Sequence, residues 1–170
     1  VGNGLENGVV QGPLINPAAV DKVQAHIGDA LGKGARLVCG GEPHALGGTF
    51  FQPTVLADVT DAMQVAREET FGPLAPVFRF ETDEQAIAMA NATDYGLSAS
   101  IWTTDPDRAA RVARRIEAGT VWVNCWLLRD LRVPFGGIKH SGVGREGGEE
   151  GWLEGGRYRD GGGEAPAERS

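Results

Sequence analysis

The segment 124–148, NCWLLRDLRVPFGGIKHSGVGREGG, brings a thiol, several guanidinium groups and an imidazole into one glycine-rich stretch. A cysteine acts as a nucleophile when a base, a cation or a helix N-terminus lowers its pKa. Cys125 has Arg129 and His140 nearby in sequence, so a Cys-His hydrolase is one interpretation. A free cysteine that closes an apolar strand is more often a small buried hydrophobe, and no spaced Asn or Asp accompanies this one. We therefore interpret Cys125 as a packing residue.

Arg129 is the second candidate in this segment, because it lies among large apolar residues in LLRDLRVPF. A guanidinium in such surroundings is costly unless it meets an anion. Its planar fork suits a carboxylate, and a charged hydrogen bond contributes about 1.5 to 3 kcal/mol. An internal ion pair with Asp130 explains the same pattern equally well, so both interpretations stay open.

A second motif, EETFGP, places two carboxylates before an aromatic side chain and a Gly-Pro turn. The carboxylate of Glu69 can accept two hydrogen bonds from a sugar diol, and Phe71 can lie against a flat heterocycle. From the spacing alone, an ordinary turn with a packed Phe71 is the preferred interpretation.

The glycine-rich motif and the histidines give weaker indications of a binding site. Residues 142–147, GVGREG, have the spelling of a dinucleotide fingerprint, but a loop precedes them rather than a strand, which favours a glycine-rich connection. His26, His44 and His140 lie far apart and lack metal-ligand spacing with the cysteines. We expect each histidine to be a surface or packing residue and no metal to be bound.

The composition excludes several classes of partner. A formal net charge of -7 provides no basic field for nucleic acid or an anionic membrane. The two cysteines, with no signal peptide or apolar run of membrane-spanning length, indicate a reduced, cytoplasmic setting.

Apolar periodicity and turn residues predict a helix near the N-terminus and regularly alternating helices and strands from residue 75 onwards. Asn16, Thr82 and Thr104 are the expected helix caps. The predicted helices cover residues 17–33, 83–91 and 105–117, and the predicted strands cover 75–80, 98–103 and 120–124. Strands separated by helices favour an α/β fold with a mostly parallel sheet and crossover helices.

The two ends of the chain differ from its middle. The first residue is Val1 rather than methionine, and the chain reads as if cut from a longer one. Residues 149–170 are rich in glycine with few apolar anchors, so we predict a disordered tail after a packed portion covering 1–148.

Taken together, several motifs in the same order resemble the C-terminal part of the catalytic domain of the aldehyde dehydrogenase superfamily. They are GPLI, GGTFFQPTVL, AREETFGPLAPVFRF, AIAMANATDYGLSASIWTTD and PFGGIKHSGVGREG. The resemblance implies a partial α/β catalytic domain, NAD or NADP as cofactor, and oxidation of a small aldehyde through a thiohemiacetal and a thioester. It implies a homo-oligomer for the intact family enzyme.

By this resemblance, Glu69 matches the glutamate that holds the nicotinamide ribose, and Phe71 the aromatic beside the nicotinamide. Phe135 matches an aromatic of the substrate tunnel. The nucleophilic cysteine and the general-base glutamate are expected before Val1, so we expect the chain alone to be inactive.

Two segments of the chain resemble two different subfamilies. Residues 44–91 resemble succinate semialdehyde dehydrogenases, whereas VNCWLLRDLRVPFGG resembles 2-aminomuconate and 2-hydroxymuconate semialdehyde dehydrogenases. In the latter group the arginine matching Arg129 holds the substrate carboxylate. The resemblance therefore implies a carboxylated semialdehyde, with a muconic type favoured over a succinic one. The alternative is a non-catalytic remnant that binds a full-length relative.

Overall fold

The structure is a computed structural model that describes residues 1–148 and residue 151. The chain divides into two compact units, Val1–Phe80 and a second unit that begins at Glu81. The predicted portion 1–148 therefore spans both units, and its status as one domain stays a prediction. The predicted tail, 149–170, lies outside the described residues except for Gly151.

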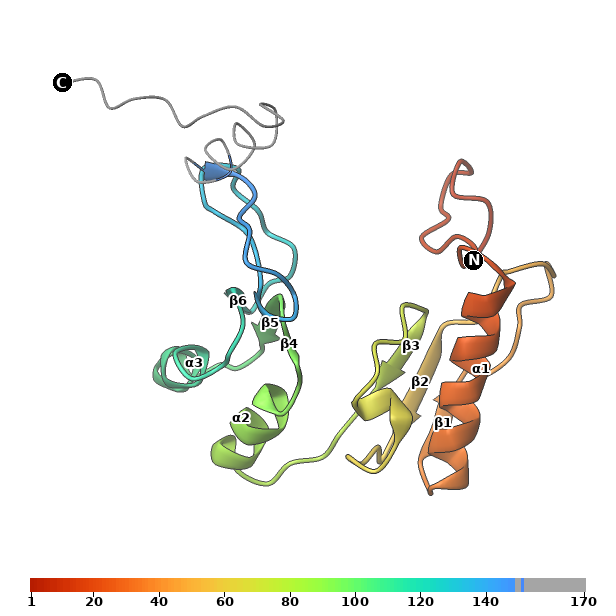
Figure 1. The fold of residues 1–170 in the computed structure, drawn as a ribbon, viewed down its shortest axis with the longest axis horizontal. Coiled ribbons are helices and arrows are strands. Elements are labelled where there is room, and N and C mark those ends of the chain that lie inside the picture. Colours follow the sequence, from red (N-terminus) through yellow and green to blue (C-terminus); the bar gives the residue numbers. More distant parts are fainter. Residues whose placement is uncertain (149–150, 152–170) are drawn as a thin grey trace, which may run out of the picture. The chain divides into compact units, whose positions relative to one another are not determined.

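The first unit places one helix on a small sheet (Figure 1). Its elements are α1 (Pro17–Gly32), β1 (Arg36–Cys39), β2 (Thr54–Ala57), the 3-10 helix η1 (Gln64–Ala66) and β3 (Leu74–Pro76). The Oδ1 atom of Asn16 accepts a hydrogen bond from the amide of Ala19 at 2.9 Å, so the predicted cap of α1 is confirmed. It satisfies one of the amides that a helix start leaves unpaired.

The core of the first unit forms where the apolar face of α1 meets the sheet and the segment around η1. Val23, Ile27 and Ala30 of α1 are buried with Phe51 and with further apolar side chains of the sheet and the η1 segment, which are Leu56, Met63 and Val65. Burying a side chain of this size contributes about 1.5 to 3 kcal/mol relative to leaving it exposed. This cluster therefore holds α1 in place beside the loop that follows η1.

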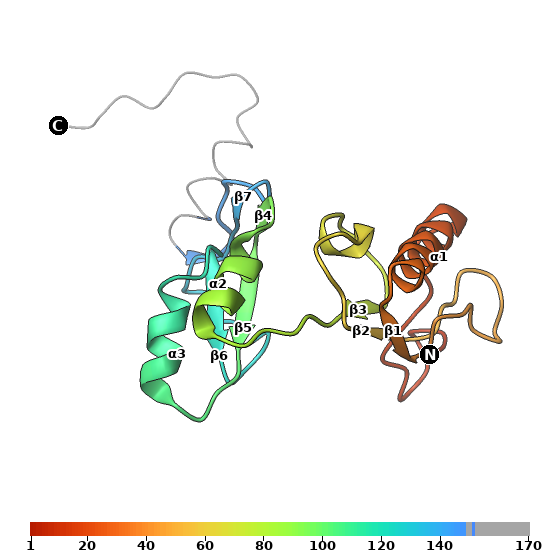
Figure 2. The ribbon, with the colours of Figure 1, turned by 90° about the horizontal axis from the view of Figure 1, so that it is seen from below.

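The second unit begins with α2 (Asp83–Asn91), β4 (Tyr95–Gly96) and β5 (Ser98–Ile101). It continues with α3 (Pro106–Ala113), β6 (Thr120–Val123) and β7 (Ile138–Lys139). Figure 2 shows α2 and α3 beside the β5–β6 pair. Asp105, not the expected Thr104, caps α3: its Oδ1 accepts hydrogen bonds from the amides of Asp107 and Arg108, and Pro106 is the first helical residue.

The expectation of one mostly parallel sheet is only partly correct. β5 and β6 are parallel with α3 as the crossover helix, and β2 and β3 are also parallel. β1 pairs with β2 in the antiparallel direction, as does β4 with β7. Residues 40–53 between β1 and β2 contain no helix, so the chain reverses directly and the two strands run in opposite directions. The described residues thus form three small sheets.

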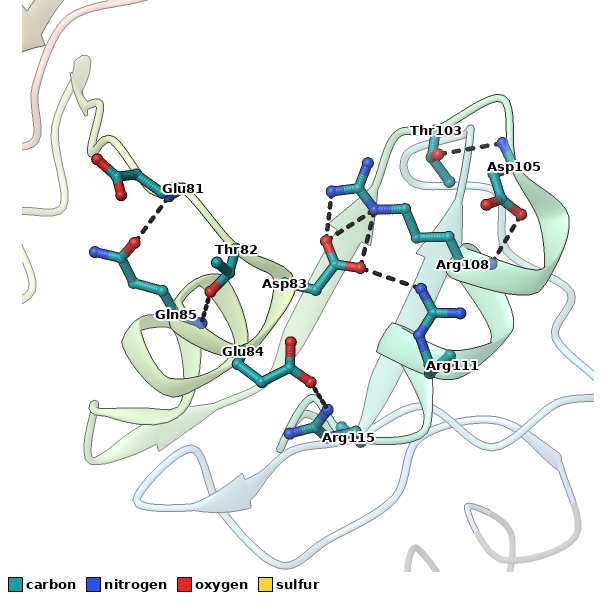
Figure 3. Close-up of polar contacts among 10 residues, drawn as sticks. All are labelled: Glu81, Thr82, Asp83, Glu84, Gln85, Thr103, Asp105, Arg108, Arg111 and Arg115. Atoms are coloured by element: carbon teal, nitrogen blue, oxygen red, sulfur yellow. Dashed lines mark hydrogen bonds and ion pairs between the residues drawn. The ribbon is translucent and has the colours of Figure 1, made fainter.

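An ion-pair cluster joins the start of α2 to α3 in the second unit (Figure 3). Arg108 donates from Nε to both carboxylate oxygens of Asp83, at 2.8 and 3.1 Å, and Arg111 donates to the same carboxylate at 3.2 Å. The hydrogen bonds from Arg108 hold the pKa of the Asp83 carboxyl below its usual value. Glu84 pairs with Arg115 at 2.8 Å. The cluster thus connects α2 to α3 by charged hydrogen bonds.

Replacing Asp83 with Asn is expected to change how the stability of the chain responds to acid. A depressed folded-state pKa adds stability above the unfolded value of about 3.9, and this stability is lost as the pH falls through the lower folded-state value. The variant should therefore be less stable at neutral pH, and its unfolding curve should converge with that of the wild type in acid. Far-UV circular dichroism during acid titration measures this. Asp21→Asn on the exposed side of α1 is the control, and an equal effect there would contradict the prediction.

Candidate functional site

The first predicted site lies on the loop that follows η1, residues 68–72, which we call the EETF loop. Glu69 is exposed, and Phe71 is 83% exposed. The backbone of Phe71 has a φ of 53°, a left-handed conformation that is uncommon for a bulky residue and persists only when its surroundings impose it. The interpretation of Phe71 as a packed turn residue is therefore wrong for the described chain, and both side chains are available to a ligand.

Three contacts with α1 fasten this loop. The side chain of Lys22 donates to the carbonyl of Glu69, and the buried His26 contacts Thr70 at 2.9 Å. A Cβ atom on Gly72 would overlap the side chain of Val23, so the loop passes close to the helix where only glycine fits. The EETF loop is therefore positioned by its contacts with α1.

The second predicted site is an open pocket in the second unit. It has a volume of about 670 Å³ and is lined by Thr120 and Trp122 of β6 together with residues 128–131 and 133–135. Arg129 and Phe135 both belong to this lining, and the Cζ atom of Arg129 lies 4.3 Å from the centroid of the Phe135 ring. A guanidinium at this distance over an aromatic face is attracted by the ring, and its N–H groups can still meet a carboxylate.

The partners of Arg129 decide between the two interpretations of this residue. Asp130 pairs with Arg132, whose Nε lies 2.9 and 3.1 Å from its carboxylate oxygens, and these bonds hold the pKa of Asp130 below its usual value. Arg129 is instead 3.6 Å from the carboxylate of Glu146. The expected alternative of an Arg129–Asp130 pair is therefore wrong. The charge of Asp130 is already compensated by Arg132.

Arg129 is also less enclosed than the sequence indicates. Its side chain is 41% exposed, so the guanidinium is not a buried charge that must be compensated. The pocket is apolar along much of its wall, through Leu128, Leu131 and Val133. A cation at the edge of such a pocket can bind the charged end of an otherwise apolar or extended small molecule.

The rest of the wall is held by contacts from β6 and from the glycine-rich segment. Trp122 stacks on Phe135 with ring centroids 6.4 Å apart, and its Nε1 donates to the carbonyl of Leu128 at 2.9 Å. Phe135 and Glu146 exchange two backbone hydrogen bonds, each 2.6 Å long. These bonds hold the backbone of Phe135, whose ring lies against Arg129. Through Glu146, the glycine-rich segment 142–147 supports the backbone of the pocket wall.

Cys125 and His140 do not form the arrangement that a Cys-His hydrolase needs within the described residues. The ring of His140 meets the ring of Tyr95 edge-on at 6.4 Å. Cys125 is half-buried, and its carbonyl accepts a hydrogen bond from the Ser100 hydroxyl at 3.3 Å. Neither contact activates a thiol.

The described residues contain neither a group of metal ligands nor a membrane-spanning helix. No group of three or more His, Cys, Asp or Glu side chains among residues 1–148 and 151 could hold a metal ion. Over the same residues, no helix combines the length and the apolar character needed to cross a membrane.

Three contributors to these sites were not identified from the sequence. They are His26 beneath the EETF loop, and Trp122 and Glu146 beside Arg129. His26 could have been found, because helical spacing places it with Val23 and Ala30 on the buried face of α1. Glu146 carries no comparable signal, since its contact with Arg129 depends on how two loops meet.

The family model described as "Aldehyde dehydrogenase family" matches residues 1–158. A 3-sulfolactaldehyde dehydrogenase from Pseudomonas putida is 54% identical over 91% of this chain and 32% of its own length. The succinate-semialdehyde dehydrogenase [NADP(+)] GabD of Escherichia coli is 53% identical over 91% of this chain and 33% of its own. A crystal structure of betaine aldehyde dehydrogenase from Staphylococcus aureus in complex with NAD+ has a TM-score of 0.84 and 37% identity, covering 90% of this chain and 31% of that one.

The chain is an α/β structure with an arginine and an aromatic ring in one pocket, and it matches known aldehyde dehydrogenases over most of its length. The chain belongs to the aldehyde dehydrogenase family. It spans about a third of the length of the relatives that it matches.

Proposed function

We propose that this chain supplies the substrate pocket and part of the cofactor site of an NAD(P)-dependent semialdehyde dehydrogenase. The observation that carries the proposal is Arg129 held over Phe135 in a largely apolar pocket, with Asp130 engaged by Arg132. The substrates named for the P. putida and E. coli relatives, sulfolactaldehyde and succinate semialdehyde, each carry an anionic group far from the aldehyde. Both would present such a group to Arg129.

Each residue then has a defined task. Arg129 binds the far carboxylate through charged hydrogen bonds, and Phe135 packs against the carbon chain. Glu69 accepts hydrogen bonds from the ribose hydroxyls of NAD or NADP, while Phe71 packs near the nicotinamide. The nicotinamide, when bound, accepts the hydride from the oxidised carbon. The named side chains contribute binding and orientation only.

The finer choice of substrate rests on the loop around Arg129. Residues 123–137 favour a muconic-type semialdehyde, and the relatives named above include a succinic type. The longer, conjugated skeleton of a muconic-type semialdehyde would span more of the pocket wall. Steady-state kinetics with both semialdehydes would decide between them.

We propose that the nucleophilic cysteine comes from residues outside this chain, so that the chain alone is inactive. Positioning and electrostatics cannot replace a missing nucleophile. The purified 170-residue chain, mixed with NADP+ and succinate semialdehyde, should give no nicotinamide reduction above buffer. Measurable aldehyde oxidation by the chain would overturn this part of the proposal.

A second candidate function is that of a non-catalytic module that binds a full-length relative. The observation that favours it is the exposure of large apolar side chains in the second unit, with Trp102 68%, Trp126 69% and Leu131 78% exposed. Such surfaces are usually covered by a partner. Co-purification with a tagged E. coli relative would support this function, and consistent elution in separate fractions would count against it.

The cofactor assignment can be tested in a chimera, in which this chain replaces the segment of the E. coli enzyme to which it aligns. In this chimera, Glu69→Gln should raise the KM for NADP+ by about tenfold, because a neutral amide is a weaker acceptor for a ribose diol than a carboxylate. Glu6→Gln, in the N-terminal loop, is the matched control. An unchanged KM in the Glu69 variant would remove Glu69 from the cofactor site.

A further inference from the structure

His26 is a buried imidazole that neither the pocket nor the ion-pair cluster uses. It lies on α1, is 2% exposed, and directs both ring nitrogens at the EETF loop (Figure 1 shows the helix). Its Nδ1 is 2.9 Å from the Thr70 hydroxyl, and its Nε2 is 3.4 Å from the carboxylate of Glu68. We infer that His26 is a positioning residue that sets the EETF loop for the nicotinamide ribose, an inference that rests on the proposed function.

The two contacts define what the imidazole does chemically. A carboxylate only accepts hydrogen bonds, so Nε2 carries a proton when it contacts Glu68. In the neutral ring, Nδ1 then accepts from the hydroxyl of Thr70. One side chain thus holds two loop residues with a donor and an acceptor at once. A leucine would fill the same space without either contact.

Anchoring Thr70 toward the helix has a consequence for its neighbours. Thr70 is half-buried, whereas Glu69 and Phe71 on either side of it are exposed. Holding Thr70 toward α1 fixes the backbone between the two proposed cofactor residues, whose side chains are exposed. The left-handed backbone of Phe71 needs such an external restraint, because a bulky residue does not adopt it unaided.

The loop is held on its far side as well, which limits where it could move. Gly72 passes against Val23, and the amide of Thr54 donates to the carbonyl of Pro73 at 2.8 Å. Releasing Thr70 would therefore loosen the stretch around Glu69 and Phe71, while the Lys22 contact to the Glu69 carbonyl and the end at Pro73 stay in place. The expected effect is a poorly placed ribose contact rather than loss of the fold.

The test uses the chimera with variants on both sides of the contact. Thr70→Val should raise the KM for NADP+ by about fivefold, as the loss of one hydrogen bond predicts. His26→Leu removes the contacts to both Thr70 and Glu68 and should raise it by at least as much, with kcat and the KM for succinate semialdehyde within about twofold in both variants. Thr70→Ser keeps the hydroxyl and should restore the KM for NADP+. Ile27→Val, buried on the same helix, should leave that KM unchanged. Hydrogen exchange of the peptide 66–74 should quicken in the first two variants only.

The outcomes separate this inference from the proposed function. If Glu69→Gln raises the KM for NADP+ but Thr70→Val does not, the positioning role is wrong and the cofactor assignment stands. If Glu69→Gln has no effect, both are wrong. Equal effects of Thr70→Val and Thr70→Ser, or of His26→Leu and Ile27→Val, would indicate a packing role and overturn the inference. If His26→Leu fails to fold, the KM for NADP+ of Thr70→Val tests the positioning role by itself.

Discussion

Arg129→Ala in the chimera should lower kcat/KM for succinate semialdehyde by roughly tenfold to a hundredfold. The physical reason is the loss of charged hydrogen bonds to the substrate carboxylate, which contribute about 1.5 to 3 kcal/mol, where each 1.36 kcal/mol is a tenfold change in rate. Butanal has the same number of carbon atoms and no carboxylate, so its kcat/KM should change by less than about twofold. Steady-state kinetics with the two aldehydes measure the difference.

Arg114→Ala provides the control for this change. Arg114 is exposed at the end of α3 and is not part of the pocket lining, so its removal deletes an equal charge from the same unit. We expect only a small loss with either aldehyde, since a single exposed charge contributes little. Equal losses with succinate semialdehyde and butanal in the Arg129 variant would show that Arg129 supports the loop rather than the substrate.

Gly119→Ala is expected to have the largest effect on stability. The turn before β6 touches the backbone of residues 136 and 137, and a Cβ atom on Gly119 would overlap the carbonyl oxygen of Gly136 and lie 3.1 Å from the Cα of Gly137. Two backbone segments must then separate, so we expect a cost of about 3 kcal/mol or more, the upper range for overpacking. The temperature of half-inactivation of the chimera should fall by at least several degrees.

This substitution should also disturb the pocket, because residues 136 and 137 directly follow Phe135. The amide of Gly119 donates to the carbonyl of Gly96 at 3.0 Å, so the turn cannot easily move away. Gly12→Ala is the control, because a Cβ there meets nothing within 4 Å. Wild-type heat resistance in the Gly119 variant would mean that this close approach does not occur in the protein.

Helix positions were largely predictable because their signals are local. Asn16 and Thr82 each cap a helix through an amide three residues ahead, and apolar spacing marked the buried face of α1. Both signals act within one or two turns of the chain. The end of α3 was placed too late, since the helix stops at Ala113 rather than at residue 117. Helix ends carry weaker local signals than helix starts.

Strand direction was less predictable, and for a different reason. The α3 crossover made β5 and β6 parallel as expected, because a helix between two strands leaves few alternatives. The antiparallel partners of β2 and β4 are β1 and β7. Pairing of this kind depends on loop paths, which periodicity does not describe.

For the sites, the sequence by itself determined which residue types were present: a carboxylate and an aromatic in EETF, and an arginine followed by a phenylalanine in RDLRVPF. It also carried the family motifs. Only the tertiary structure decided that Asp130 forms its ion pair with Arg132 and not with Arg129. It also decided that Arg129 lies over the ring of Phe135 and near Glu146. The contact of His26 with Thr70 spans 44 residues of sequence. Such choices depend on which surfaces meet after folding, because side-chain partners are set by proximity in space.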